Sequence, residues 1–168
     1  DGLQITCAVF VHHLISNENE VKNFDANYKV FPPLRTDIDK QALIDGLIDG
    51  TIDTISAQHT PLNIDEKNVE FELAEFGMIG LETAFGLLNK NIGNQISKEK
   101  MIELLAVNPR KIIGKPAHAE DFVILNFEEE VVFTENRIRS KSKNTPYLGH
   151  SLKGKVKAVI AKGKFYPN

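Results

Sequence analysis

The feature that most constrains the fold is a pair of β-type segments that contain apolar runs and are separated by a helical segment. The two segments are "LQITCAVFV" (residues 3–11) and "TIDTISA" (51–57). Strands with so little polar alternation are typical of parallel sheets that are covered on both faces. The order of strand, helix and strand therefore predicts α/β packing.

The helix between these strands has clear signals at both ends. Thr36 and Asp39 have the spacing of a capping box, and Gly50 ends the segment "DIDKQALIDGLIDG". We predict that its buried face is apolar, formed by Ala42, Leu43, Leu47 and Ile48.

Two further helices follow the second strand. "MIGLETAFGLLNK" (78–90) has helical periodicity. "KEKMIELLAV" (98–107) follows Ser97, which is a favourable N-cap, and Pro109 is expected to halt the helix. The resulting order of strand, loop, helix, strand, loop, helix and helix favours a parallel sheet.

The character of the chain changes near residue 115. "DFVILNF", "EEEVVFT", "KVKAVIA" and "GKFYP" are short β-type runs without helices between them, and Lys162-Gly163 predicts a turn before the last run. We therefore predict an α/β part at 1–114 and an antiparallel β part at 115–168, with the boundary near Gly114–Pro116.

Two parallel strands make a poor sheet, because both would have exposed edges despite their apolar composition. The chain is therefore expected to be the C-terminal part of a larger α/β protein. We expect it to associate with a missing N-terminal half or with itself, as a homo-oligomer.

Charge and composition exclude several classes of protein. The net charge of −3 conceals a basic segment, but Lys153, Lys155 and Lys157 alternate with smaller residues, as on the solvated face of an exposed strand. We therefore expect no nucleic-acid partner. No apolar run is long enough to cross a membrane, and the single Cys7 is expected to be a small buried hydrophobe, which favours the cytoplasm.

Three blocks closely resemble the C-terminal half of dihydroorotase, an amidohydrolase-superfamily enzyme of pyrimidine biosynthesis. They are "FPPLR" (31–35), "FGMIGLETA" (76–84) and "KSKNTP" (141–146). The resemblance implies a metal-centred (β/α)₈ TIM-type barrel with a small β-sandwich. The chain would supply the last two barrel strands and the C-terminal share of the sandwich, because 168 residues are too few for a whole barrel of about 250.

The chemistry of that family does not carry over position by position. Where the family reads Asp-His-Ala-Pro-His, this chain has Gln58-His59-Thr60-Pro61-Leu62. The resemblance implies that the aspartate touches the metal and accepts a proton from the attacking water, which the amide of Gln58 cannot do. Leu62 replaces a substrate-holding histidine, and Phe31 replaces a substrate-contacting asparagine. We therefore expect no intact catalytic residue.

The metal ligands of active family members, which bind zinc, are implied to lie mostly upstream. His12 and His13 are adjacent, so on an extended segment they would point to opposite sides, and we interpret them as structural. His59 is interpreted as a satisfied loop residue, and His118 and His150 as surface residues. We expect no metal or other cofactor bound by this chain.

The remaining motif residues have structural interpretations. Lys29 and Arg35 are expected to be solvated loop charges, although an anionic ligand is the open alternative. Glu82 suits the positive end of a helix, and Asn144-Thr145-Pro146 predicts a turn.

Two hypotheses for function follow. The first is a non-catalytic dihydroorotase-like protein, or pseudoenzyme, that acts as a structural partner of aspartate transcarbamoylase. The alternative is a metal-dependent cyclic amidohydrolase, either dihydroorotase or a related enzyme, in which Phe31 and Leu62 shape an apolar pocket and the metal site lies mostly in the missing half.

Overall fold

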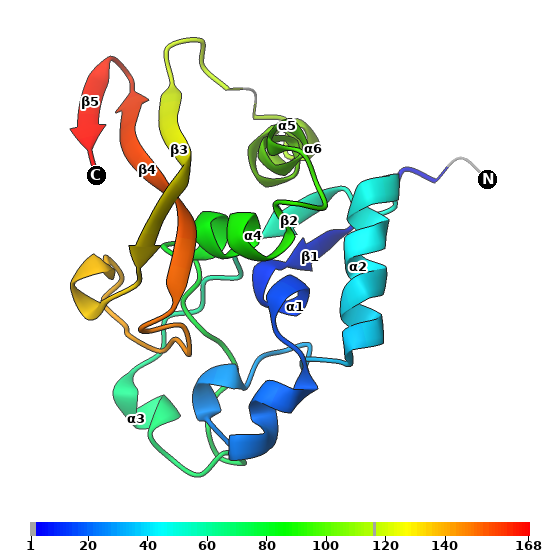
Figure 1. Ribbon diagram of the computed structural model, residues 1–168, viewed down its shortest axis with the longest axis vertical. Helices are drawn as coiled ribbons and strands as arrows, with labels where there is room; N and C mark the ends of the chain where they lie inside the picture. The colour runs from blue at the N-terminus through cyan, green and yellow to red at the C-terminus, as the bar shows by residue number, and fades with distance from the viewer. Residues whose placement is uncertain (1–2, 116) are drawn as a thin grey trace.

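The computed structural model describes residues 3–115 and 117–168, so the predicted boundary residue Pro116 lies outside the described residues (Figure 1). A parallel pair of strands, β1 (Ala8–Phe10) and β2 (Thr54–Ser56), lies among the helices. The first strand is shorter than predicted, because only its last part pairs with β2. The prediction of a buried Cys7 is wrong: the residue is exposed in the segment before β1.

Short helical turns occupy much of residues 12–35, where the sequence predicts a long loop between the first strand and the helix. They are α1 (Val11–Ile15), η1 (Glu18–Asn23) and η2 (Ala26–Tyr28). The side chains of Asn17 and Asp25 accept hydrogen bonds from the backbone N–H groups of Asn19 and Asn27, at 2.8 and 2.9 Å. Such local bonds favour tight turns over extended chain.

Both predicted ends of the next helix, α2 (Asp37–Asp49), are confirmed. Thr36 and Asp39 form the reciprocal capping box, and Gly50 adopts a left-handed φ of 87°. The predicted buried face is wrong in part, because Ala42 is exposed and Ile48 is 51% exposed. The helix instead buries its residues Ile44, Gly46 and Leu47.

The later helices differ from the prediction at their boundaries. They are α3 (Ile64–Lys67), α4 (Ala84–Ile92), α5 (Lys98–Ile102), η3 (Glu103–Val107) and α6 (Asn108–Ile112). The helix predicted from residue 78 begins only at Ala84, because Met78 forms a parallel bridge with His59. Ser97 caps α5 as predicted. Pro109 does not end the helical stretch, because it lies in the first turn of α6, where a missing N–H costs little.

An antiparallel sheet forms the last part of the chain. Its strands are β3 (Phe122–Val132), β4 (Ser151–Ala161) and β5 (Lys164–Pro167), in that order, and η4 (Glu135–Arg137) follows β3. The two runs "DFVILNF" and "EEEVVFT" form one strand, because register shifts near Asn126 let a single strand bend. The predicted turn is confirmed, with φ values of 51° at Lys162 and 72° at Gly163.

The basic face of β4 is neutralised within the sheet. Lys153 Nζ lies 3.1 Å from a carboxylate oxygen of Glu128, and Lys155 and Lys157 both pair with Glu129. The prediction that these lysines lie on a solvated strand face is confirmed, because their side chains are 38%, 25% and 43% exposed.

The sheet packs closely against α4 (Figure 1). A Cβ on Gly86 would come within 2.7 Å of the Leu152 side chain, so only glycine permits this approach. The Asn89 side-chain amide donates to the carbonyl oxygens of Phe127 and Lys153, at 2.7 and 2.9 Å. The helix therefore fixes the sheet relative to the β1–β2 pair.

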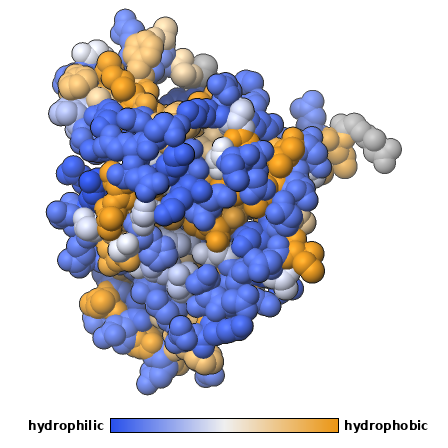
Figure 2. Space-filling model, in the orientation of Figure 1, coloured by the Kyte–Doolittle hydropathy of each residue, from blue (hydrophilic) through white to orange (hydrophobic). Residues whose placement is uncertain are grey.

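The surface is largely hydrophilic, with apolar groups exposed in patches, one of them at the end of the sheet near the top of the view (Figure 2). That end carries the exposed residues Phe122, Val123, Phe165 and Tyr166. Within the described ranges, no helix combines the length and the apolar character needed to cross a membrane.

Candidate functional site

The candidate site lies in the loops that follow the carboxyl ends of β1 and β2. Because the two strands are parallel, their ends meet at the same edge, where active-site residues of α/β proteins gather. We call Phe31, Gln58 and Leu62 the mouth positions, because they are the residues that the sequence singled out for this edge.

Gln58 is committed to a hydrogen bond within the chain. Its Nε2 donates to the carbonyl oxygen of Phe31 at 2.8 Å, and its backbone has a left-handed φ of 44°. Non-glycine residues seldom adopt this conformation, so the side chain is held where the turn places it. Its Oε1 is buried and has no partner within the described residues. The amide therefore joins two loops and carries no proton-accepting group of useful basicity.

Phe31 contributes its backbone to this bond and its ring to an aromatic surface. The ring is 67% exposed and meets Phe76 edge to face, with centroids 5.9 Å apart. Lys29 lies beside it, with its Nζ 4.7 Å from the Phe76 centroid, and donates to the carbonyl oxygens of Phe71 and Glu72. The prediction that Lys29 is a solvated loop charge is therefore wrong, because the chain itself uses its donors.

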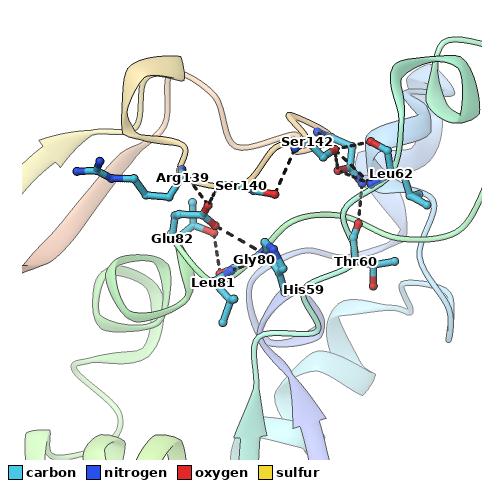
Figure 3. Close-up of polar contacts among 11 residues, drawn as sticks. His59, Thr60, Leu62, Gly80, Leu81, Glu82, Arg139, Ser140 and Ser142 are labelled. Atoms are coloured by element: carbon cyan, nitrogen blue, oxygen red, sulfur yellow. Dashed lines mark hydrogen bonds and ion pairs between the residues drawn. The ribbon is translucent and has the colours of Figure 1, made fainter. Parts of the chain in front are cut away.

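Leu62 is held by its backbone (Figure 3). Its N–H donates to Ser142 Oγ at 3.2 Å and to Asn144 Oδ1 at 3.3 Å. The Leu62 carbonyl oxygen accepts a short hydrogen bond from the Ser142 hydroxyl. Its aliphatic side chain can offer only apolar contact.

Asn144 is the residue that sequence reasoning undervalued. Its buried side chain donates to the carbonyl oxygens of Thr60 and Gly77, at 3.0 and 3.2 Å, besides accepting from the Leu62 N–H. Its own carbonyl oxygen accepts from the Ile79 N–H at 2.9 Å. The block "KNTP" was the available signal, but it had been interpreted only as a turn.

Glu82 joins the loop before α4 to the segment before β4 (Figure 3). Its Oε1 accepts from the backbone N–H groups of Arg139 and Ser140, at 3.1 and 2.8 Å. Glu82, Ser142 and Asn144 thus form a set of side chains that bond mostly to backbone groups, which we call the linker network.

His59 is satisfied by backbone donors, as interpreted from the sequence. Its Nδ1 accepts from the N–H groups of Gly80 and Leu81, at 3.2 and 3.4 Å, so this nitrogen carries no proton. Glu82 Oε2 lies 3.9 Å from it, which is a charged pair only if the ring becomes protonated. We interpret the ring as a positioning group for the loop before α4.

His12 and His13 lie together, contrary to the prediction of opposite sides. They belong to the short helix α1 rather than to extended chain, and their ring centroids are 4.4 Å apart. Burial, aided by the neighbouring His13, lowers the pKa of His12 to about 3. Burial also lowers the pKa of His13, against the opposing effect of the carbonyl groups of Pro32 and Pro33. Both rings are therefore neutral near pH 7.

The residues present do not fit a zinc ion. Within 3–115 and 117–168, no group of three or more histidine, cysteine, aspartate or glutamate residues could hold a metal. The orphaned Oε1 of Gln58 is a neutral amide oxygen, which is a weak zinc ligand. His118 and His150 are exposed in the β part, as expected.

Curated relatives are found over nearly the whole chain, although no protein-family model matches it. A dihydroorotase of Caldanaerobacter subterraneus subsp. tengcongensis is 42% identical over 171 residues, which cover 98% of this chain and 40% of the relative. The dihydroorotase of Bacillus subtilis is 40% identical over 171 residues, covering 97% of this chain and 40% of the relative. The chain is a dihydroorotase homologue. It spans about 40% of the length of these curated relatives.

Solved structures give the same fold. An L-hydantoinase (dihydropyrimidinase) from Arthrobacter aurescens matches with a TM-score of 0.89 at 22% identity, covering 98% of this chain and 39% of that one. An inactive dihydroorotase-like domain of a Chaetomium thermophilum CAD-like multifunctional protein matches with a TM-score of 0.69 at 21% identity, covering 98% and 44%. The expectation of part of a TIM-barrel amidohydrolase fold is confirmed.

Proposed function

We propose that the protein is a non-catalytic dihydroorotase-like protein of pyrimidine biosynthesis, which acts in the cytoplasm as a structural partner of aspartate transcarbamoylase. The observation that carries the proposal is the hydrogen bond from Gln58 Nε2 to the Phe31 carbonyl oxygen at 2.8 Å. An amide used in this way supports structure at the position where the family resemblance implies a proton acceptor.

The two other mouth positions support the proposal. Leu62 has no polar side-chain atom, and Phe31 offers a substrate only its ring, because its carbonyl oxygen is already bonded to Gln58. Three positions of one site therefore lack the polar groups that the resemblance implies. The Chaetomium thermophilum neighbour, an inactive dihydroorotase-like domain, gives a precedent for this fold without the activity.

The test of inactivity is an assay of the full-length protein with zinc supplied, measured as both ring closure to dihydroorotate and ring opening. We expect no turnover above a metal-free blank in either direction. Turnover well above that blank would remove the basis of the proposal.

The structural partnership needs its own test. The full-length protein would be mixed with aspartate transcarbamoylase from the same source and analysed by sedimentation velocity. We expect a stable complex. If the two proteins sediment independently, the partnership is wrong even if the protein is inactive.

A second candidate is a metal-dependent hydrolase of an apolar cyclic amide. It is favoured by the exposed Phe31–Phe76 ring pair beside Gln58 and by the likeness to hydantoinase structures. Zinc analysis of the purified full-length protein separates the two: near-stoichiometric tightly bound zinc favours the hydrolase, whereas its absence favours the pseudoenzyme.

We also propose that this chain associates with the N-terminal half of the same protein, or with itself. The support is the open β1–β2 pair and the exposed apolar residues Leu3 and Ile5 before it, which are 80% and 77% exposed. A stable, well-folded monomer of the 168-residue chain in size-exclusion chromatography would contradict this association.

A further inference from the structure

A cavity lies beside the mouth, with Leu62 in its wall. It has a volume of about 860 Å³ and lies between the η2 turn, α3 and the segment before β4. In Figure 1, α3 lies near both of those segments, at the lower left of the view. The volume is in the range of small-molecule sites, which run from roughly 300 to 1,000 Å³.

The cavity wall contains a buried cation. Lys67, the last residue of α3, lines the cavity and is only 7% exposed. Its Nζ donates to the carbonyl oxygen of Glu75 at 2.8 Å, and an ammonium group has three donors. Within the described residues, no carboxylate lies within ion-pair distance of it. Buried lysines are almost always paired, so this site is electrostatically incomplete.

The surroundings of Lys67 also disfavour its positive charge. Burial, and secondly the nearby charge of Lys29, lower the pKa of Lys67 to about 8, while Asp25 and Glu75 oppose the shift. The group is thus mostly protonated at pH 7, and an anion beside it would raise its pKa.

The other charged residues of the wall leave a net positive cavity. Besides Lys67, the cavity wall contains Lys141 and Lys143 and a single acid, Asp25. Lys143 pairs with Glu135 at 3.0 Å, whereas Lys141 has no ion pair among the described residues. The positive charges of Lys67 and Lys141 together therefore exceed the negative charge of Asp25.

The uncharged residues of the lining are half apolar and half polar, and the apolar ones include Pro61, Leu62, Ile64 and Val69. A cationic group beside such an apolar patch of the wall favours a ligand with one anionic group and an apolar body. We propose that this cavity is a binding site for a small organic monocarboxylate, whose carboxylate pairs with Lys67 and whose apolar body lies on Leu62, Ile64 and Val69. The proposal goes beyond the proposed function, because binding here does not depend on whether the mouth is catalytic.

The test uses benzoate as the probe and benzamide as its neutral, nearly isosteric control. Binding to the full-length protein is followed by methyl NMR of Leu62, Ile64 and Val69. We expect benzoate to shift these signals and to bind about tenfold more tightly than benzamide, as one charge-assisted hydrogen bond allows. Equal affinity for the two probes, or no shift of these methyl groups, would overturn the proposal.

Substitution of Lys67 tests whether its ammonium group binds the carboxylate of the ligand. Lys67→Met keeps the length of the side chain and removes its charge, and we expect it to abolish the preference for benzoate. Lys90→Met, at an exposed lysine of α4, is the matched control and should keep that preference. Retention of the preference in Lys67→Met would show that the carboxylate binds elsewhere.

A second pair of variants keeps the test decisive if Lys67→Met does not fold. Val69 lines the cavity and is 39% exposed, so it tolerates a polar side chain. Val69→Glu places a competing carboxylate on the wall and should weaken benzoate binding about tenfold, whereas Val69→Gln should not. Equal benzoate affinity in both variants would contradict the pairing with Lys67.

Discussion

The mouth positions and the linker network are neighbours, yet their side chains are used in different ways. Asn144 uses both ends of its amide on backbone groups, and Glu82 accepts from two backbone N–H groups. Among the mouth positions, Gln58 makes a single side-chain bond, and the side chains of Leu62 and Phe31 offer only apolar surface. Polar side chains hold backbone groups in the linker network, whereas two of the three mouth positions carry apolar side chains.

The largest expected effect lies in the linker network. Asn144→Ala removes hydrogen bonds to Thr60, Gly77 and Leu62, and the carbonyl oxygens of Thr60 and Gly77 lose this donor. We expect the free energy of unfolding to fall by about 3 kcal/mol. Chemical denaturation measures it, with the exposed Asn94→Ala as control. A loss no larger than that of the control would erase the contrast between the two regions.

The next largest effect is expected in the pH dependence of stability, through His12, the buried histidine of α1. Because the folded-state pKa of His12 is lowered to about 3, its contribution to stability is present above the unfolded value of 6.5 and is lost as the pH falls. At pH 5 the cost is about 2 kcal/mol, at 1.4 kcal/mol per pH unit.

The substitution His12→Phe keeps a ring in this place and removes the titration. We expect the stability difference between pH 7 and pH 5 to shrink by that amount in His12→Phe, and to be unchanged in His118→Gln, at an exposed position. An unaltered pH dependence in His12→Phe would mean that the buried ring is not the titrating group.

The bond between Gln58 and Phe31 is tested by an isosteric change. Gln58→Glu places a carboxylate oxygen against the Phe31 carbonyl oxygen, so both partners become acceptors. We expect a loss of about 1–2 kcal/mol at pH 7. The loss should disappear near pH 4, because burial beside an acceptor raises the pKa of the new carboxyl group and its neutral form can donate.

The same stability at both pH values would show that the amide is not bonded to Phe31. Gln95→Glu, at an exposed position, is a matched control for the added charge.

The smallest effect is expected at Leu62. Its backbone makes the contacts that hold the loop, and its side chain makes none of the hydrogen bonds. We expect Leu62→His to change the unfolding free energy by less than about 0.5 kcal/mol. A loss comparable to that of Asn144→Ala would show that the Leu62 side chain supports the fold as the linker network does.

The sequence-based predictions are correct where the deciding signal lies within a few neighbouring residues. The capping box at Thr36, the left-handed Gly50 and the turn at Lys162–Gly163 depend on a few neighbouring residues, and all are confirmed. The start of α4 was wrong because Met78 pairs with His59, a contact that periodicity does not reveal.

The same limit applies to the candidate site. Motif comparison found Gln58, Leu62 and Phe31, but not the bond that joins Gln58 to Phe31, which lie 27 positions apart. Asn144 was undervalued because its partner Thr60 lies 84 positions earlier. The prediction for the buried pair His12–His13 is wrong because these residues form a short helix, whereas the prediction assumes extended chain.

The central claim is that the amide of Gln58 supports structure where a catalytic relative would accept a proton. The most direct test measures dihydroorotate turnover by the zinc-supplied full-length protein, side by side with its Gln58→Ala variant. We expect both to remain at the metal-free background. Turnover by the native protein that Gln58→Ala abolishes, in a variant that stays folded, would contradict the claim.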